Sequence, residues 1–243
     1  EVVTKKNIED RQVLHQTVEL MDQYYQRCAP DKPVADLQLT GVTAFFVAAK
    51  NIMIEPFSLE EARTVLCYEK YTAEQFLAKE RELRHLLVYQ NEACSYADFF
   101  TLFLKATKSE FLADYTSDKK AQVGKAKRII DSTRAFFDDW ERLGDQLLRL
   151  ALVDCFLKRY LRGYVAAAIF IMAFEHLLDD ALSLGHRARS KYDLTHIVSV
   201  YSSLNKVMAQ YFGHHKYVFM QTFAKFVKRR FSILFLQYSG IVR

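Results

Sequence analysis

One segment of this chain recurs about half a chain length later. Residues Leu37–Lys50 (LQLTGVTAFFVAAK) align with Arg159–Met172 (RYLRGYVAAAIFIM), which places Gly41 on Gly163 at a shift of 122 positions. Further residues keep this shift to within one position: Ala44 with Ala166, Val47 with Ile169, Lys70-Tyr71 with Lys191-Tyr192, and Tyr89 with Tyr211. A shift held this steady over roughly 50 residues indicates a duplicated structural unit. We therefore expect a fold that builds one arrangement twice.

The second copy lacks two charged residues of the first. Lys50 aligns with Met172, and Glu80 aligns with Tyr201 or Ser202. A lysine at a helix end is ordinarily a favourable C-terminal charge, and a glutamate among other charges is ordinarily solvated. Packing alone gives no reason why only one copy should keep both residues. We therefore predict a specific role for Lys50 and Glu80 that the second copy does not share.

Glycine and proline are scarce, which favours helices over strands. The 243 residues include only 7 Gly and 3 Pro, and no proline follows Pro56. Because 51% of the residues are hydrophobic, the chain can bury one large core or two smaller ones. The composition predicts an all-α protein.

Helical periodicity places the expected elements in two units, residues 1–94 and 95–243. Helices are expected in the first unit at Asp10–Arg27, Leu37–Lys50, a short stretch from the N-cap Ser58, and Thr72–Tyr89, where Thr72 and Gln75 have capping-box spacing. Helices are expected in the second unit at Ala97–Ala106, Lys127–Arg142, Gln146–Phe156, Arg159–Leu177, Leu194–Tyr211 and, as a C-terminal helix, Val218–Leu236. The polar stretch at 107–126 is interpreted as an insertion. Gly41 and Gly163 are interpreted as packing residues that let neighbouring helices approach the central helix of each unit.

Several functional classes find little support in the sequence. The net charge of +5 is mild and the basic runs are typical of solvated helix faces, so no nucleic-acid partner is expected. The longest apolar run, Tyr164–Phe174, is too short to span a bilayer. The four cysteines show no CxxC spacing, His214-His215 lacks metal-ligand spacing, and no catalytic or phosphate-binding motif occurs. We expect no catalytic residue, metal, cofactor or membrane contact, and a reducing compartment.

The order of six segments resembles the cyclin family over nearly the whole chain. In the first unit these segments are LHQTVELMDQYY (Leu14–Tyr25), LQLTGVTAFFVAAK followed by IEP (Leu37–Pro56), and YTAEQFLAKERELRHLLVY (Tyr71–Tyr89). In the second unit they are ALVDCFLKRYLRGYVAAAIF (Ala151–Phe170), KYDLTHIVSVYSSL (Lys191–Leu204) and FAKFVKRRFSILFL (Phe223–Leu236). The resemblance is to divergent cell-cycle cyclins of the A/B type with two cyclin boxes.

The resemblance implies a fold and a partner. It implies two tandem five-helix cyclin boxes plus a C-terminal helix, with most of the first helix of the first box absent or preceding Glu1. It further implies that the chain is not an enzyme but binds and activates a cyclin-dependent serine/threonine kinase, with kinase substrates or inhibitors as further partners, in the nucleus, the cytoplasm or both.

The resemblance also implies roles for individual residues. Lys50 and Glu80 match the charged pair with which cyclins contact backbone around the kinase C-helix. The matched positions of the surrounding apolar contact surface are Val47, Ile54 and Tyr89. Leu37 and Gln38 match part of the substrate-docking groove, and Asp22 matches the characteristic aspartate of the second helix.

Some residues depart from the family pattern and leave alternatives open. After Lys50 the family usually has an aromatic and two acidic residues, whereas this chain has Asn51, Ile52 and Met53, which puts contacts to the kinase activation segment in question. Arg84 stands where an apolar residue is common. One alternative is a nucleic-acid-associated protein of the general transcription factor IIB type, although no zinc-ribbon cysteines are visible. Another is a scaffold of cyclin fold without kinase activation.

Overall fold

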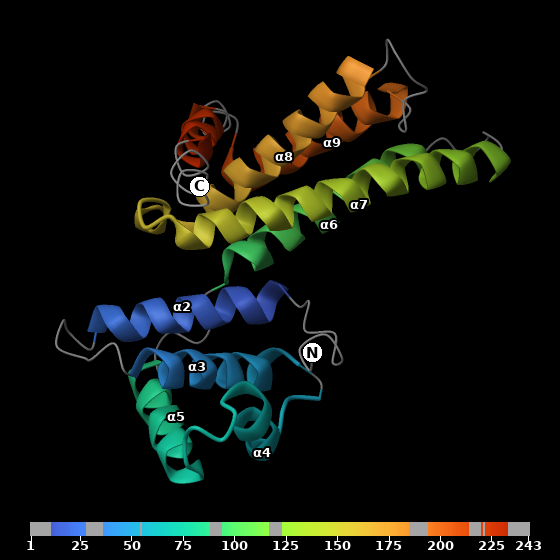
Figure 1. Cartoon of the computed structure of the whole chain (residues 1–243). Helices are drawn as coiled ribbons and strands as arrows, with labels where there is room; N and C mark the ends of the chain where they lie inside the picture. Colours follow the sequence, from blue (N-terminus) through green and yellow to red (C-terminus); the bar gives the residue numbers. More distant parts are fainter. Residues whose placement is uncertain are drawn as a thin grey trace. The chain divides into compact units, whose positions relative to one another are not determined.

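The structure, a computed structural model, describes residues 11–27, 36–53, 55–87, 94–116, 123–184, 194–213, 220 and 222–232. Across these ranges the regular elements are helical and no strand occurs, as the composition predicts. The chain divides into two compact units between Ser95 and Tyr96 (Figure 1), one residue beyond the expected boundary. Within the described part of the chain, no helix combines the length and apolarity needed to cross a membrane.

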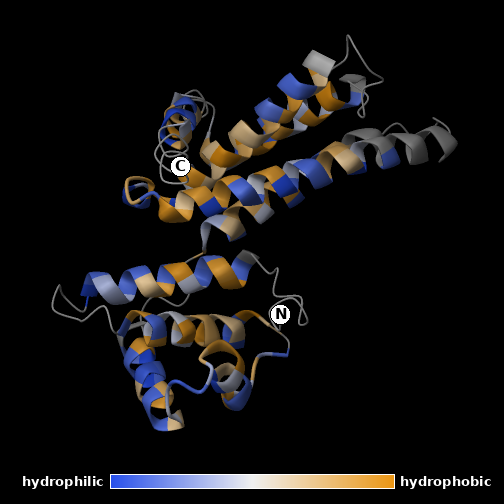
Figure 2. Cartoon of the chain, viewed as in Figure 1, coloured by the Kyte–Doolittle hydropathy of each residue, from blue (hydrophilic) through white to orange (hydrophobic). Residues whose placement is uncertain are grey.

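The first unit is built around a buried central helix. Its elements are α2 (Arg11–Arg27), α3 (Leu37–Ile52), α4 (Leu59–Glu61) continued by a π-helical segment η2 (Ala62–Leu66), and α5 (Ala73–Leu87). The helix α3 packs against both α2 and α5, and its buried residues lie on several faces. Figure 2 shows α3 as the more hydrophobic helix and α5 as the more hydrophilic one, which fits a core helix with a surface helix packed on it.

Both expected helix starts in this unit are confirmed. The Ser58 hydroxyl accepts a hydrogen bond from the Glu61 backbone N–H at 3.1 Å, and the Glu61 carboxylate accepts one from the Ser58 N–H at 2.9 Å. Thr72 and Gln75 form the same reciprocal pair before α5, at 3.3 and 2.9 Å. Each capping box satisfies backbone donors that the first helical turn leaves unpaired.

The second unit is built around α8, which packs against α6, α7 and α9. Its elements are α6 (Tyr96–Thr116), α7 (Val123–Val153), the 3-10 turn η3 (Leu157–Arg159), α8 (Arg162–Leu184), α9 (Leu194–Phe212) and a helix at 222–232. Every residue from 165 to 174 is buried, so the apolar run seen in the sequence is a core helix. Trp140 of α7 stacks on Phe170 at 4.3 Å between ring centroids and donates its indole N–H to the Phe170 carbonyl at 2.9 Å.

Two helices of this unit are longer than expected. Residues 107–116 continue α6, and α7 begins at Val123, so most of the polar stretch at 107–126 is helical. Thr107 and Phe111 are buried and extend the inward face of α6, with Phe111 packed on Phe137 of α7 at 6.0 Å. Because most residues of this stretch are polar, the helical spacing of the buried Thr107 and Phe111 was not recognised in the sequence.

The helices expected at Lys127–Arg142 and Gln146–Phe156 are one helix, α7, with Gly144 inside it. A Cβ at Gly144 would lie 2.0 Å from the ring of Phe100 on α6. The glycine therefore admits an aromatic ring against the helix backbone, and it does not break the helix.

Candidate functional site

Lys50 and Glu80, 30 positions apart in the sequence, form an ion pair. Lys50 lies in the last turn of α3 and Glu80 in the middle of α5, and the Lys50 ammonium donates to Glu80 Oε1 at 3.1 Å. The Glu80 side chain is 9% exposed and that of Lys50 is 35% exposed. The ammonium also lies 4.1 Å from the ring centroid of the buried Phe46, which holds it over an aromatic face. The structure thus brings together the two residues that distinguish the first copy.

Arg84 joins this pair and was not assigned a role from the sequence. Its Nε donates to Glu80 Oε1 at 3.0 Å, one helical turn along α5. Both cations therefore bond the same carboxylate oxygen, and among the described residues Oε2 of Glu80 accepts no hydrogen bond. The i to i+4 spacing of Glu80 and Arg84 was the sequence signal for this contact. We refer to Lys50, Glu80 and Arg84 as the charged triad.

A second ionic network fixes the position of α5. The Lys79 ammonium is 7% exposed and donates to Asp36 at 2.5 Å, to Glu82 at 2.8 Å and to the Tyr24 hydroxyl at 2.9 Å. The Tyr24 hydroxyl in turn donates to Glu82 at 3.0 Å. Burial lowers the pKa of Lys79, but its three hydrogen-bond acceptors outweigh burial and raise the pKa above its ordinary value. The network ties α5 to α2 and to the start of α3, next to Glu80.

Of the three residues expected in the apolar contact surface, the structure describes only Val47. Val47 is 1% exposed and lies in the core of the first unit, so as folded it offers no surface to a partner. Ile54 and Tyr89 lie outside the described residues. Beside the triad, Asn51 is exposed while Ile52 and Met53 are half-buried. The accessible apolar surface next to Lys50 is therefore that of Ile52 and Met53.

Leu37 and Gln38 lie at the opposite end of α3 from the triad. With a rise of about 1.5 Å per residue, the two ends are about 20 Å apart. Leu37 is exposed, and the side-chain amide oxygen Oε1 of Gln38 accepts hydrogen bonds from the Lys70 ammonium at 2.7 Å and from the Tyr71 hydroxyl at 3.4 Å. Close by in the sequence, Tyr68 is 85% exposed and has a positive φ of 50°. The two predicted binding surfaces are thus separate.

The remaining predicted residues, Asp22, Gly41 and Gly163, all lie on helices. Asp22 is half-buried on α2. A Cβ at Gly41 would lie 3.4 Å from the Met21 side chain of α2, and one at Gly163 would lie 3.5 Å from the Phe99 ring of α6. Both glycines therefore face a neighbouring helix, as the packing interpretation expects.

The corresponding place in the second unit is apolar. Met172, aligned with Lys50, is 7% exposed and belongs to the buried stretch of α8. Tyr201 of α9 stacks on Phe174 at 5.6 Å instead of offering a carboxylate. The charged triad is therefore a property of the first unit.

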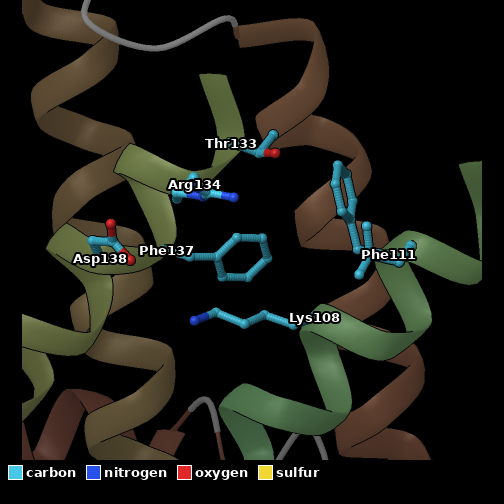
Figure 3. Close-up of a pocket in the computed structure, with 7 residues that line it drawn as sticks. Lys108, Phe111, Thr133, Arg134, Phe137 and Asp138 are labelled. Carbon is cyan, nitrogen blue, oxygen red and sulfur yellow. The ribbon is translucent and has the colours of Figure 1, made fainter. Parts of the chain in front are cut away.

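The second unit contains a pocket of about 160 Å³ between α6 and α7 (Figure 3). Phe111 and Phe137 form its apolar floor, and Lys108, Arg134 and Asp138 lie around it. Charges of both signs around a small apolar floor select no single class of ligand. Among the residues that the structure describes, no group of three His, Cys, Asp or Glu side chains has the arrangement of a metal site.

The sequence of the first unit matches a protein-family model. Residues 1–90 match the model of the cyclin N-terminal domain. The first unit is a cyclin N-terminal domain. The matched residues contain α2, α3 and α5, and therefore the whole charged triad.

A solved structure extends the likeness of fold to both units of the chain. It is a viral cyclin from herpesvirus saimiri, with a TM-score of 0.52 and 14% sequence identity. The match covers 86% of this chain and 82% of that one. At this identity the comparison concerns the fold alone. No curated protein sequence matches this chain significantly.

Proposed function

We propose that this chain is a non-catalytic regulatory subunit that binds and activates a cyclin-dependent protein kinase through its first unit. The observation that carries the proposal is the charged triad, in which Lys50 and Glu80 meet at 3.1 Å although they lie on different helices. The cyclin N-terminal domain supplies the class of partner, and the resemblance of these two positions supplies the contact.

The chemistry of the triad suits recognition of partner backbone. Glu80 Oε2 is available to accept a backbone N–H, while the Lys50 ammonium, with 35% of its side chain exposed, can donate to a carbonyl. The rigid end of α3 fixes Lys50, and the Lys79 network fixes α5 beneath Glu80. Both side chains are therefore preorganised, which lowers the entropy lost on binding.

Activation requires that the cyclin favour one state of the kinase. An active kinase needs its C-helix turned inward, so that the Lys–Glu pair of the kinase forms and its metal-binding aspartate is in place. A rigid face that binds only the inward state shifts the kinase population by the difference in affinity. Ile52 and Met53 replace the usual acids, so we propose apolar contacts to the activation segment in place of ionic ones.

The test uses purified kinases and charge-altering variants. A panel of cyclin-dependent kinases is titrated with the whole chain, and binding is measured by biolayer interferometry and activation by peptide phosphorylation. Glu80→Ala and Lys50→Glu should each weaken binding by about 2–5 kcal/mol, because each leaves a partner group buried without its counterpart. Arg81→Glu, an exposed charge reversal beside Glu80, is the matched control and should bind as the wild type does.

Two results would contradict this proposal, one its binding contact and the other its activation step. If both variants bind every kinase as the wild type does, the triad is not the contact. If a kinase binds in a triad-dependent way but gains no activity, the protein is a scaffold of cyclin fold, the alternative that the absence of acids at Ile52 and Met53 favours.

We further propose that Leu37 and Gln38 help to dock kinase substrates or inhibitors. Leu37 is exposed, and the bonds from Lys70 and Tyr71 hold the Gln38 amide in a defined orientation. Leu37→Ser should lower phosphorylation of substrates that carry a separate docking segment and leave that of short peptides unchanged. Equal loss for both substrate types would contradict the proposal.

A further inference from the structure

One serine of the chain follows two consecutive arginines at a defined spacing. The sequence Lys228-Arg229-Arg230-Phe231-Ser232 places arginine three and two positions before Ser232. No other serine or threonine of the 243 residues has arginine at both of these positions. Serine/threonine kinases select substrates partly by the charges around the hydroxyl, and arginines so placed suit a kinase with an acidic substrate groove. The sequence therefore indicates Ser232 as a candidate for phosphorylation.

The structure places the Ser232 hydroxyl on an exposed side of the helix at 222–232, the red helix of Figure 1. The hydroxyl donates to the Lys228 carbonyl at 3.0 Å, one turn earlier in the helix. Another face of the same helix is buried through Val227 and Phe231. The atom that would accept a phosphoryl group is thus at the surface, while the helix itself is packed on the second unit.

Arg230, in contrast to Ser232, is engaged in the folded chain. Its guanidinium donates two hydrogen bonds of 3.2 Å to Asp154, which follows the end of α7 and has a side chain that is 1% exposed. The guanidinium also lies 4.6 Å from the ring centroid of Phe156. Two bonds to one carboxylate fix the orientation of a guanidinium. A kinase that binds Arg230 in its own groove therefore has to separate it from Asp154.

We propose that Ser232 is a phosphorylation site for an arginine-directed serine/threonine kinase, and that the Asp154–Arg230 ion pair controls access to it. Only chains in which this pair is open present Arg230 to the modifying kinase, so the open fraction limits the rate of phosphorylation. The site lies in the second unit and does not rest on the proposed kinase contact of the first.

The modification is an ordinary phosphoryl transfer from ATP bound to the modifying kinase. The Ser232 oxygen attacks the γ-phosphorus, and the new Oγ–P bond forms as the bond from that phosphorus to the ADP oxygen breaks. The hydroxyl proton passes to the catalytic aspartate of the modifying kinase. The products are phosphoserine and ADP, and nothing is oxidised or reduced.

A phosphate on Ser232 favours the open state. It carries a charge of about −1.5 to −2 and three strong acceptor oxygens, and the modified oxygen no longer donates to the Lys228 carbonyl. Once the segment is open, these oxygens can bind the guanidinium of Arg230, which must give up those bonds before it returns to Asp154. The phosphate thus stabilises the open state relative to the docked one and shifts the population toward it.

The docked helix is also less favourable once it carries the phosphate. Partial burial raises the pKa of Glu175 on α8, and the charge of Lys228 opposes this rise. A phosphate one helical turn from Lys228 competes for the same ammonium. It also adds negative charge near the Glu175 carboxylate. We therefore expect phosphorylation to loosen the packing of this helix on the second unit.

The first test identifies the modified hydroxyl. The whole chain is incubated with ATP and a purified kinase, chosen because it phosphorylates a reference peptide with arginine three and two positions before serine and not its alanine counterpart. Tandem mass spectrometry should find the phosphate on Ser232, and Ser232→Ala should remove most of the incorporated phosphate. The matched control is Ser190→Ala, where arginines stand three and one positions earlier. This control should leave the phosphate at Ser232 unchanged.

The second test measures the control of access. Asp154→Asn keeps the arginines but removes the ion pair, so it should raise the initial rate of phosphorylation at least about fivefold. Val227→Ala removes a buried contact of the same helix without a change of charge and should also raise the rate. Asp131→Asn, an exposed change on α7, is the matched control and should leave the rate unchanged. Circular dichroism checks that each variant retains its helical content.

The third test measures the effect of the phosphate by hydrogen exchange. In the phosphorylated chain, the amides of residues 222–232 should exchange at least about tenfold faster than in the unmodified chain, while those of α6 stay unchanged. The Ser232→Ala variant, taken through the same reaction, is the control.

Three results would overturn the proposal. One is phosphate on other hydroxyls with none on Ser232. Another is an equal rate for the wild type and for both Asp154→Asn and Val227→Ala. The last is unchanged hydrogen exchange over residues 222–232 after Ser232 has been phosphorylated.

Discussion

The central helices α3 and α8 come from the same sequence pattern but differ at aligned positions. In α3, Lys50 is partly exposed and bonds Glu80 across to α5, with Arg84 on the same carboxylate. In α8, Met172 is 7% exposed and lies within ten consecutive buried residues. The two units thus share a frame, while only the first has an ion pair at this aligned position.

Folding stability favours the apolar residue at this aligned position and does not explain the ion pair of Lys50 and Glu80. A partly exposed ion pair contributes about 0–1 kcal/mol to folding, so stability gives little reason to keep the pair in the first unit. Burying Met172 contributes more, because a fully buried methionine side chain stabilises by about 1.5–3 kcal/mol. The second unit therefore has the residue that folding favours, and the first has a pair for which we propose a role in binding.

The largest expected effect comes from placing a lysine at position 172 of α8, which aligns with Lys50 of α3. Met172→Lys should destabilise the second unit by about 4 kcal/mol or more, because a buried lysine has its pKa lowered by up to about 3–5 units and each unit corresponds to about 1.4 kcal/mol. Thermal unfolding followed by circular dichroism measures the loss. Met172→Leu conserves volume and should cost less than about 1.5 kcal/mol. A Lys variant as stable as the Leu variant would show that α8 is not the closed core helix described here.

A second comparison sets the buried Lys79 of the first unit against an exposed lysine of the second unit. Lys79→Met should cost about 3 kcal/mol, because it removes the buried cation that joins Asp36, Glu82 and Tyr24. The measurement is the free energy of unfolding in urea, and Lys105→Met on α6 serves as an exposed control. A loss below about 1 kcal/mol would mean that the carboxylates are adequately solvated without Lys79.

The glycines provide a third comparison. Gly144→Ala should destabilise by about 1–3 kcal/mol, since the added Cβ would lie 2.0 Å from the Phe100 ring. Gly41→Ala should be neutral or stabilising by up to about 1 kcal/mol, because the nearest atom is the flexible end of Met21 at 3.4 Å and alanine favours the helix. Differential scanning calorimetry of both variants tests this order. Equal effects would contradict the different packing of the two glycines.

Local chemistry made much of the fold predictable. The scarcity of glycine and proline predicted helices, the capping boxes at Ser58 and Thr72 set two helix starts, and the repeat located both central helices. The errors came from the second unit, where tertiary packing overrides a local preference. Gly144 resembles a helix break until Phe100 is placed beside it, and the buried Thr107 and Phe111 are hidden in a polar stretch.

The candidate site was predictable only where single residues carried the information. Lys50 and Glu80 emerged because one copy keeps them and the other does not. Arg84 was noted in the sequence as a departure from the family, and its i to i+4 spacing from Glu80 permits a contact that only the side-chain geometry shows. The Lys79 network joins residues 55 and 43 positions apart, a pairing that periodicity along one helix does not reveal. Val47 resembled a contact residue by position, but its burial depends on α3 being surrounded by other helices.

The smallest expected change in stability belongs to the pair that we propose to matter most for binding. Lys50→Met gives α3 the residue that α8 has, and it should change the free energy of unfolding by no more than about 1 kcal/mol, because Arg84 still neutralises Glu80. The same variant should weaken kinase binding by more than that, since a donor to the partner is lost from the interface. Urea unfolding and kinase titration on one preparation give both numbers. A stability loss as large as the binding loss would make Lys50 a folding residue, and the asymmetry between the two units would then need another explanation.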